Sequence, residues 1–161
     1  MTGGTIKSEP GFSPSLDAEF VGTGNDYIHN DPSGKHMRLN AHGVVKDKES
    51  GAMVYVNYSG VVDITPELGA ILQGHEDAKS TEFGNSCKST LDLTTPAFSL
   101  TTSLADYHAQ FQVIEIRFET GDEKLQALET GTFVAAGRFI YEHGKPVTVE
   151  YKISKVVKGS H

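Results

Sequence analysis

Residues 53–62 read Met-Val-Tyr-Val-Asn-Tyr-Ser-Gly-Val-Val, and apolar side chains recur at alternate positions of this run. Successive side chains of an extended chain point to opposite faces, so alternate residues share a face. One face of this segment would carry Val54, Val56, Tyr58 and Val62, and the other Met53, Tyr55, Asn57 and Ser59. This period of two, with its β-branched and aromatic residues, predicts a β-strand that is buried on one side.

The same alternation extends over the rest of the chain. It recurs at residues 35–45, 111–120 and 147–157, with weaker strand signals at residues 16–21, 89–93, 98–104 and 132–141. Glycine-containing turns separate several of these runs, at residues 31–34, 47–51 and 143–146. The turn at residues 47–51 predicts a hairpin with its glycine in a left-handed conformation.

Two segments predict short helices. Thr65-Pro66-Glu67 places proline at the first helical position, and Gly74 lies beyond the last turn. Thr120 and Glu123 have the spacing of a capping box, in which both side chains accept from free backbone N–H groups at a helix start. Many short strands with one or two helices predict an all-β, mainly antiparallel fold, built as a barrel or a sandwich.

The composition narrows the class of protein. The chain has 161 residues, of which 14 are basic and 21 acidic, for a formal net charge of −7. This size fits one domain, expected over residues 1–158, with residues 159–161 read as a tag or cloning remnant. The acidity argues against nucleic acid and anionic membranes as partners. Cys87 is the only cysteine, which excludes an intrachain disulfide, and without a secretory signal or an apolar span we expect a cytoplasmic protein.

Several short segments follow one another in an order that resembles a known family. They are Thr2–Thr5, Gly22–Tyr27, Ser50–Val56, Arg117–Asp122 and Phe133–Gly137. Over most of residues 2–157 the chain resembles the domain of unknown function 3237 family, also called uncharacterised protein family 0311. The resemblance implies a single compact β-barrel, similar to the allene oxide cyclase and lipocalin-like barrels, with no generally accepted activity. Some related barrels bind a lipophilic compound in the lumen or catalyse cyclisation or isomerisation there, which is an analogy of fold.

A mixed face of charged and aromatic groups is predicted on the strand over residues 111–120. Phe111, Glu115, Arg117 and Glu119 share this face. Apolar walls with a few placed polar groups are typical of a pocket for an organic ligand, in which Arg117 would hold a carboxylate or a developing enolate oxygen. The alternative is a surface ladder of ion pairs, each contributing about 0–1 kcal/mol. Glu119 lies in a segment matched by the resemblance, which favours a functional role for it.

A second candidate face lies on the strand over residues 35–45. It carries His36, Arg38, Asn40 and His42. Because the pKa of histidine lies near neutrality, His42 is a candidate general base if a carboxylate lies beside it. An exposed strand face produces the same pattern, so both interpretations stay open.

Asp26 and Tyr27 follow a glycine-rich turn at residues 22–24. A carboxylate next to a phenol can transfer a proton, or it can orient the turn by accepting from backbone amides, and both interpretations stay open. No histidine or cysteine spacing typical of a metal site occurs, so we expect no metal. The glycine segment lacks the third glycine of a dinucleotide fingerprint, so we expect no cofactor.

These residues lead to one main hypothesis and two alternatives. The main hypothesis is a cofactor-independent barrel enzyme that binds a small apolar or aromatic metabolite in its lumen and catalyses isomerisation, cyclisation or elimination by acid–base chemistry. Its catalytic residues would be Asp26, His42 and Arg117, and its substrate-binding residues Tyr27, Arg38, Asn40, Tyr55, Phe111 and Glu119. The alternatives are a non-catalytic binding or carrier protein and a structural homo-oligomer. A homo-oligomer is expected in each case, because exposed apolar barrel faces commonly pair.

Overall fold

The computed structural model of the protein describes residues 1–84 and 114–159. Within these residues one sheet holds all the strands, in the order β1-β2-β4-β5-β6-β7-β8, and β3 pairs with β4 beside this path. The strands are β1 Thr5–Lys7, β2 Asp17–Asp26, β3 His29–Asn30, β4 His36–Asp47, β5 Met53–Asp63, β6 Ile114–Thr120, β7 Phe133–Ile140 and β8 Thr148–Lys155. The helix α1 spans Pro66–Leu72, and the 3-10 helix η2 spans Gln126–Leu128.

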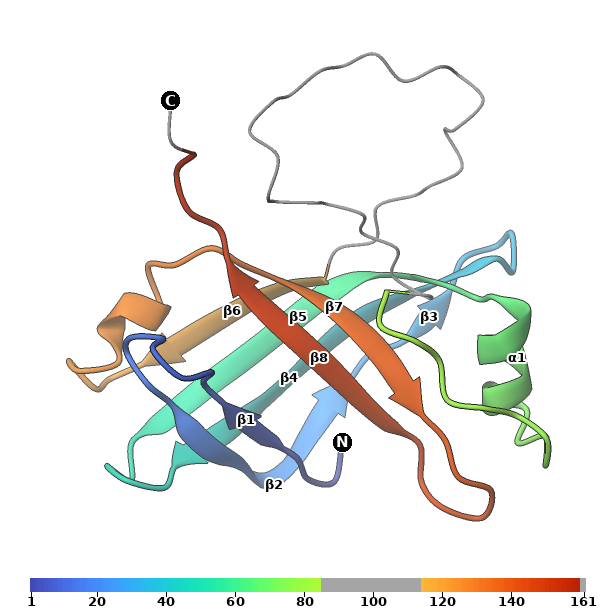
Figure 1. Ribbon diagram of the computed structural model, residues 1–161, viewed down its shortest axis with the longest axis horizontal. Helices are drawn as coiled ribbons and strands as arrows, with labels where there is room; N and C mark the ends of the chain where they lie inside the picture. The colour runs from blue at the N-terminus through green and yellow to red at the C-terminus, as the bar shows by residue number, and fades with distance from the viewer. Residues whose placement is uncertain (85–113, 160–161) are drawn as a thin grey trace.

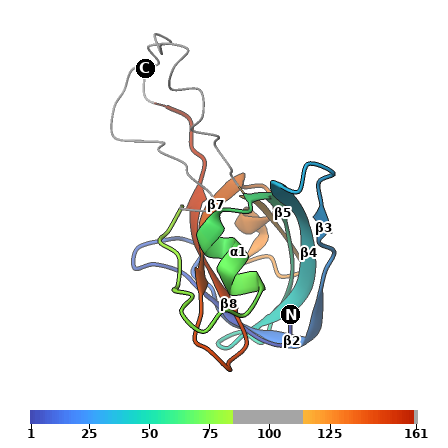
Figure 2. The same ribbon diagram turned by 90° about the vertical axis from the view of Figure 1, so that its right-hand side faces the viewer.

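The sheet is antiparallel and curled into a half-barrel. Every strand pair in it is antiparallel, and the longest register joins β4 to β5 from His36 opposite Asp63 to Lys46 opposite Met53. Figures 1 and 2 show that β7 and β8 lie across the interior from β4 and β5, with α1 at one end. The all-β barrel expected from the strand pattern is thereby confirmed.

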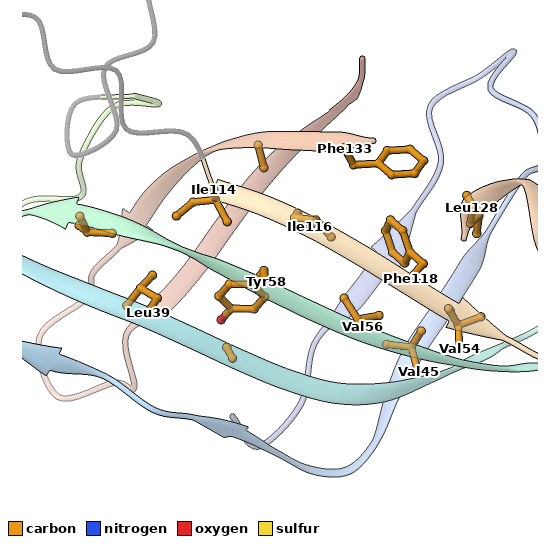
Figure 3. Packing of buried hydrophobic residues seen from close by; sticks show 14 of the residues in the cluster. Leu39, Val45, Val54, Val56, Tyr58, Ile114, Ile116, Phe118, Leu128 and Phe133 are labelled. Carbon is orange, nitrogen blue, oxygen red and sulfur yellow. The ribbon is translucent and has the colours of Figure 1, made fainter. Parts of the chain in front are cut away.

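The apolar core fills the concave side of the sheet (Figure 3). The face predicted for the segment at residues 53–62 is the buried one, because Val54, Val56, Tyr58 and Val62 all lie in the core. Neighbouring strands add residues on the same side, including Met37, Leu39, Ala41 and Val45 from β4 and Ile114, Ile116 and Phe118 from β6. The Phe118 ring meets Phe133 of β7 edge-on, with the ring centroids 5.2 Å apart.

Most predicted strands occur, with shifted ends. The segments at residues 35–45, 53–62 and 132–141 correspond to β4, β5 and β7. The segment at residues 16–21 is longer than predicted, because β2 continues to Asp26. The candidates at residues 89–93 and 98–104, and the start of the one at residues 111–120, lie outside the described residues.

The prediction of a glycine-rich turn at residues 22–24 is wrong, because these residues lie within β2. The register between β2 and β4 shifts between Val21 and Asn25, where Gly22 has a φ of +73°. Glycine adopts this left-handed backbone without a steric cost, so the strand absorbs an irregularity instead of reversing. The shift places Asn25 opposite His42 and Asp26 opposite Ala41.

The hairpin turn and the first helix agree with the sequence prediction. Gly51 ends the turn between β4 and β5 with a φ of +74°. The buried Asp47 carboxylate accepts from the backbone N–H and the hydroxyl of Ser50, each at 2.8 Å, and from Asp17 N–H at 3.2 Å. At the start of α1, the Thr65 hydroxyl accepts from Leu68 N–H. No helix among the described residues is both long and apolar enough to span a membrane.

The capping box predicted at Thr120 and Glu123 is wrong. Thr120 is the last residue of β6, and its hydroxyl donates to the Met53 carbonyl of β5 at 3.0 Å. That hydroxyl accepts from Asp122 N–H at 3.2 Å, and the Glu129 carboxylate accepts from Thr120 N–H at 2.8 Å. Strand pairing therefore holds the threonine, and only one 3-10 turn follows.

Candidate functional site

The polar side chains of β4, β5 and β6 lie on the convex side of the sheet, which we call the outer face. Residues opposite each other in an antiparallel pair point to the same side. The register therefore forms rows across the outer face, namely Asn25–His42–Asn57–Arg117, Val44–Tyr55–Glu119 and Asn40–Ser59–Glu115. Most of the residues predicted for a site from the sequence thus share one face, opposite the apolar core.

Three aromatic rings form a cluster on this face, consisting of Tyr27, His42 and Tyr55. The Tyr55 hydroxyl lies 3.1 Å from Nδ1 of His42 and forms a hydrogen bond with it. The Tyr27 ring meets His42 edge-on, with centroids 5.5 Å apart, and is 62% exposed. His42 is half-buried between the two phenols, so its imidazole is held in position while one side of the cluster faces solvent.

Asp26 lies at the end of β2, next to this cluster in the register. Partial desolvation raises the pKa of the Asp26 carboxyl, while the positive charge of the Met1 N-terminal ammonium and, to a smaller extent, that of His42 oppose the rise. On the inner side, burial raises the pKa of the Tyr58 phenol to about 12, and the negative charge of Asp26 contributes to this shift. The negative charge of Asp26 therefore acts on the buried Tyr58 phenol.

Arg117 is not part of this group. Its Nη2 lies 2.8 Å from the Glu115 carboxylate, and its side chain is 70% exposed. Asn57 of β5 stands between His42 and Arg117 in the row, and Asp26 opposes Ala41 on the inner side. The register therefore places Asp26 and His42 on opposite sides of the sheet, linked only by the electrostatic effect of His42 on Asp26, and Arg117 lies in an exposed ion pair.

The remaining predicted binding residues have different surroundings. Arg38 contacts Asp31 through an exposed ion pair of 3.3 Å. Asn40 accepts a hydrogen bond of 3.1 Å from the Asn57 amide, which also donates to the Ala41 carbonyl. Phe111 lies outside the described residues.

Glu119 and Tyr55 line an open hollow of about 400 Å³ on the outer face. The other lining residues are Val44, Met53, Thr120, Gly121 and Glu129. Glu119 lies directly opposite Tyr55 in the register. The hollow therefore combines an apolar wall, a phenol and carboxylates beside the aromatic cluster.

Sequence reasoning missed two residues of this region, Asn57 and Tyr58. Asn57 connects the side chain of β4 residue Asn40 to the β4 backbone. Tyr58 is the buried phenol that responds to Asp26. The alternation of residues 53–62 already placed Tyr58 on the apolar face, where a hydroxyl needs a partner, and this was the available signal. Its hydroxyl donates to the sulfur of Met1 at 3.3 Å.

Metal binding finds no support within residues 1–84 and 114–159. No group of three or more His, Cys, Asp or Glu side chains there could hold a metal ion. The chemistry that this arrangement offers is proton transfer and hydrogen bonding.

A family model described as "Protein of unknown function (DUF3237)" matches residues 1–156. No curated protein matches the sequence.

Solved structures share the fold. One is a conserved protein of unknown function from Rhodopseudomonas palustris, with 20% identity and a TM-score of 0.60, over 96% of this chain and 76% of that chain. A β-barrel-like protein from Acinetobacter baumannii has 17% identity and a TM-score of 0.53, over 96% and 73%. A protein of unknown function from Clostridium acetobutylicum has 16% identity and a TM-score of 0.53, over 88% and 70%. At these identities the likeness concerns the fold alone.

Proposed function

Since the chain belongs to the DUF3237 family of proteins of unknown function, its activity has to be argued from its own side chains, and we propose a cofactor-independent acid–base enzyme. Its substrate is a small apolar or aromatic metabolite with an acidic C–H bond next to a carbonyl group. The reaction is an isomerisation, cyclisation or elimination that begins with removal of this proton.

The hydrogen bond between Tyr55 and His42 carries the proposal. Because Tyr55 occupies Nδ1, Nε2 is the ring nitrogen left for a ligand. A histidine held by a second side chain is oriented for general base catalysis. The Asp26 carboxylate lies close enough to His42 for the two charges to interact, and in this scheme it is the counter-charge to the imidazolium that forms when His42 takes up the proton.

The Tyr55 hydroxyl has a second use in this scheme. For Nε2 of His42 to accept the substrate proton, Nδ1 must carry the ring hydrogen and donate it to the Tyr55 oxygen. The phenol O–H is then free to donate to the developing oxyanion of the substrate. This assigns to Tyr55 the stabilising role that the sequence suggested for Arg117, whose guanidinium is engaged by Glu115.

The proposed binding surface is the outer face rather than the lumen. Among the described residues, the interior is occupied by the packed apolar cluster, whereas Tyr27 and Met53 expose apolar surface beside His42 and Tyr55. The hollow next to Tyr55 is open to solvent, so a ligand there would rest on the surface of the sheet rather than in an enclosed pocket. An aromatic ligand there would stack on the exposed rings and present its polar group to His42.

The test uses proton exchange, which needs no knowledge of the natural product. Aromatic β-diketones and β-keto esters are incubated with the protein in deuterium oxide, and deuterium uptake at the carbon between the carbonyls is followed by NMR. We expect His42→Gln to reduce the protein-dependent rate about 10²-fold or more, and Tyr55→Phe and Asp26→Asn to reduce it less.

Lys46→Gln is the matched control, because Lys46 is an exposed residue of β4 on the same face as His42. Its exchange rate should equal that of the unmodified protein. If a β-diketone binds, and His42→Gln leaves both its affinity and its exchange rate unchanged, the enzyme proposal is wrong and a carrier is favoured.

A further inference from the structure

Glu119 of β6 is an exposed residue that lines the hollow on the outer face, directly opposite Tyr55 in the register. The second carboxylate of the hollow, that of Glu129, accepts from Thr120 N–H at 2.8 Å. For Glu119, by contrast, residues 1–84 and 114–159 supply no hydrogen bond and no ion pair. Its carboxylate is therefore available to a ligand that lies in the hollow.

The charge of the hollow is negative. Arg117, two residues from Glu119 on the same face, binds the Glu115 carboxylate through Nε at 2.9 Å and Nη2 at 2.8 Å. Among the described residues that line the hollow, none is a lysine, an arginine or a histidine. The hollow therefore repels a negatively charged group of a ligand and attracts a positively charged one.

The strand order sets the distance between Glu119 and the proposed base. Glu119 lies on β6 and His42 on β4, and Tyr55 of β5 lies between them and is hydrogen-bonded to His42. Neighbouring strands are about 4.8 Å apart, so β4 and β6 are separated by about 10 Å. A benzene ring with a substituent at each end is about this long. A ligand stacked on Tyr55 can therefore present a C–H bond to His42 at one end and a polar group to Glu119 at the other.

The proposed reaction places negative charge beside this carboxylate. Removal of a proton from carbon leaves an enolate, and the charge of Glu119 would raise the energy of that enolate. A positively charged group bound to Glu119 cancels this repulsion. The rings of Tyr27, which is 62% exposed, and Tyr55 add to the attraction, because the face of an aromatic ring attracts a cation.

We propose that the substrate carries an ammonium group and that Glu119 binds this group through a charge-assisted hydrogen bond. This inference rests on the proposed function and deepens it, because it names the substrate class of the same site. The class is an aromatic compound with a protonated amine at one end and an acidic C–H bond beside a carbonyl group at the other. Glu119 determines specificity in this scheme and transfers no proton.

The test compares three 1-phenylbutane-1,3-diones that differ only in the substituent opposite the diketone chain. The substituents are aminomethyl, which is cationic, methyl, which is neutral, and carboxylate. Isothermal titration calorimetry gives the affinities and needs no turnover. We expect the aminomethyl compound to bind about fivefold more tightly than the methyl compound at low ionic strength, and the carboxylate compound to bind most weakly. The preference should decrease as salt is added.

Glu119→Gln removes the charge and nearly keeps the shape of the side chain. It should bring the affinities of the aminomethyl and methyl compounds to within about twofold of each other. Glu19→Gln is the matched control, because Glu19 is an exposed residue of β2 on the outer face that does not line the hollow. It removes the same charge from the protein and should keep the preference for the aminomethyl compound.

Equal affinities of the aminomethyl and methyl compounds for the unmodified protein would overturn the inference, as would tighter binding of the carboxylate compound or no binding of any of the three. So would a preference that Glu19→Gln removes as fully as Glu119→Gln does. Deuterium exchange on the aminomethyl compound separates this inference from the proposed function. A preference that depends on Glu119 without any exchange would contradict the enzyme and support an ammonium compound as the ligand of a carrier.

Discussion

The Tyr151 ring of β8 lies directly over Gly137 of β7. The two residues are opposite each other in the register, and a β-carbon built at Gly137 would fall 2.7 Å from Cε1 of that ring. Tyr151 in turn packs on Tyr58 across the interior, with ring centroids 5.2 Å apart. Because Gly137 has no side chain, the Tyr151 ring can lie against the β7 backbone and pack on Tyr58 from the other side of the half-barrel.

Gly137→Ala should destabilise the fold by about 1–3 kcal/mol, because the methyl group displaces the ring from its site. The measurement is the free energy of unfolding in urea. Gly69→Ala is the control, since a β-carbon there meets no atom within 4 Å and Gly69 lies in α1. The helical control should be neutral or slightly stabilising, and an equal loss in both variants would contradict the packing argument.

Asp47→Asn should destabilise the protein by about 1–3 kcal/mol at neutral pH, because three hydrogen bonds to a carboxylate are weakened. Hydrogen bonds from Ser50 and Asp17 hold the pKa of Asp47 below its ordinary value. Its contribution to stability is present above the unfolded pKa and is lost as the pH falls through the folded pKa. The difference between the two proteins should therefore shrink in urea unfolding at about pH 3, and a difference independent of pH would contradict this account.

Asp26→Asn should change the free energy of unfolding in the opposite direction to Asp47→Asn. The pKa of Asp26 is raised by burial, so the charged form is less favourable in the folded than in the unfolded protein. Removing the charge should stabilise the fold slightly at neutral pH, by less than about 1 kcal/mol because the side chain is exposed to solvent. The gain should vanish at a pH where Asp26 is protonated. Thermal unfolding at both pH values tests this, and a loss of stability at neutral pH would show a structural hydrogen-bonding role.

Arg117→Ala should change the free energy of unfolding by less than about 1 kcal/mol, since its ion pair with Glu115 is exposed. It should also leave the rate of deuterium exchange within about twofold, unlike His42→Gln. The measurements are urea unfolding and the exchange assay on the same preparations. A rate loss comparable to that of His42→Gln would return Arg117 to the catalytic group.

Much of the fold can be predicted from residues that are close together in the sequence. Alternation assigns each side chain of the segment at residues 53–62 to a face, and all four residues of the predicted apolar face are buried. Gly51 and the Thr65 cap are equally local, because turn and helix-start geometry depend on few neighbouring residues. The prediction fails at Thr120, where a hydrogen bond to Met53, distant in sequence, competes with a local cap.

The candidate site is different, because its members come from separate strands. Alternation alone places His42, Tyr55 and Arg117 on polar faces, and Asp26 is a candidate only because its carboxyl is next in sequence to the Tyr27 phenol. Only the tertiary structure shows that Tyr55 hydrogen-bonds to His42, that Asp26 opposes Ala41 on the inner side, and that Asn57 separates His42 from Arg117. The side a residue faces follows from a period of two along one strand. The residues that come into contact are set by pairing between distant strands and by the register shift at Gly22. The residues near His42 in the sequence determine neither of these.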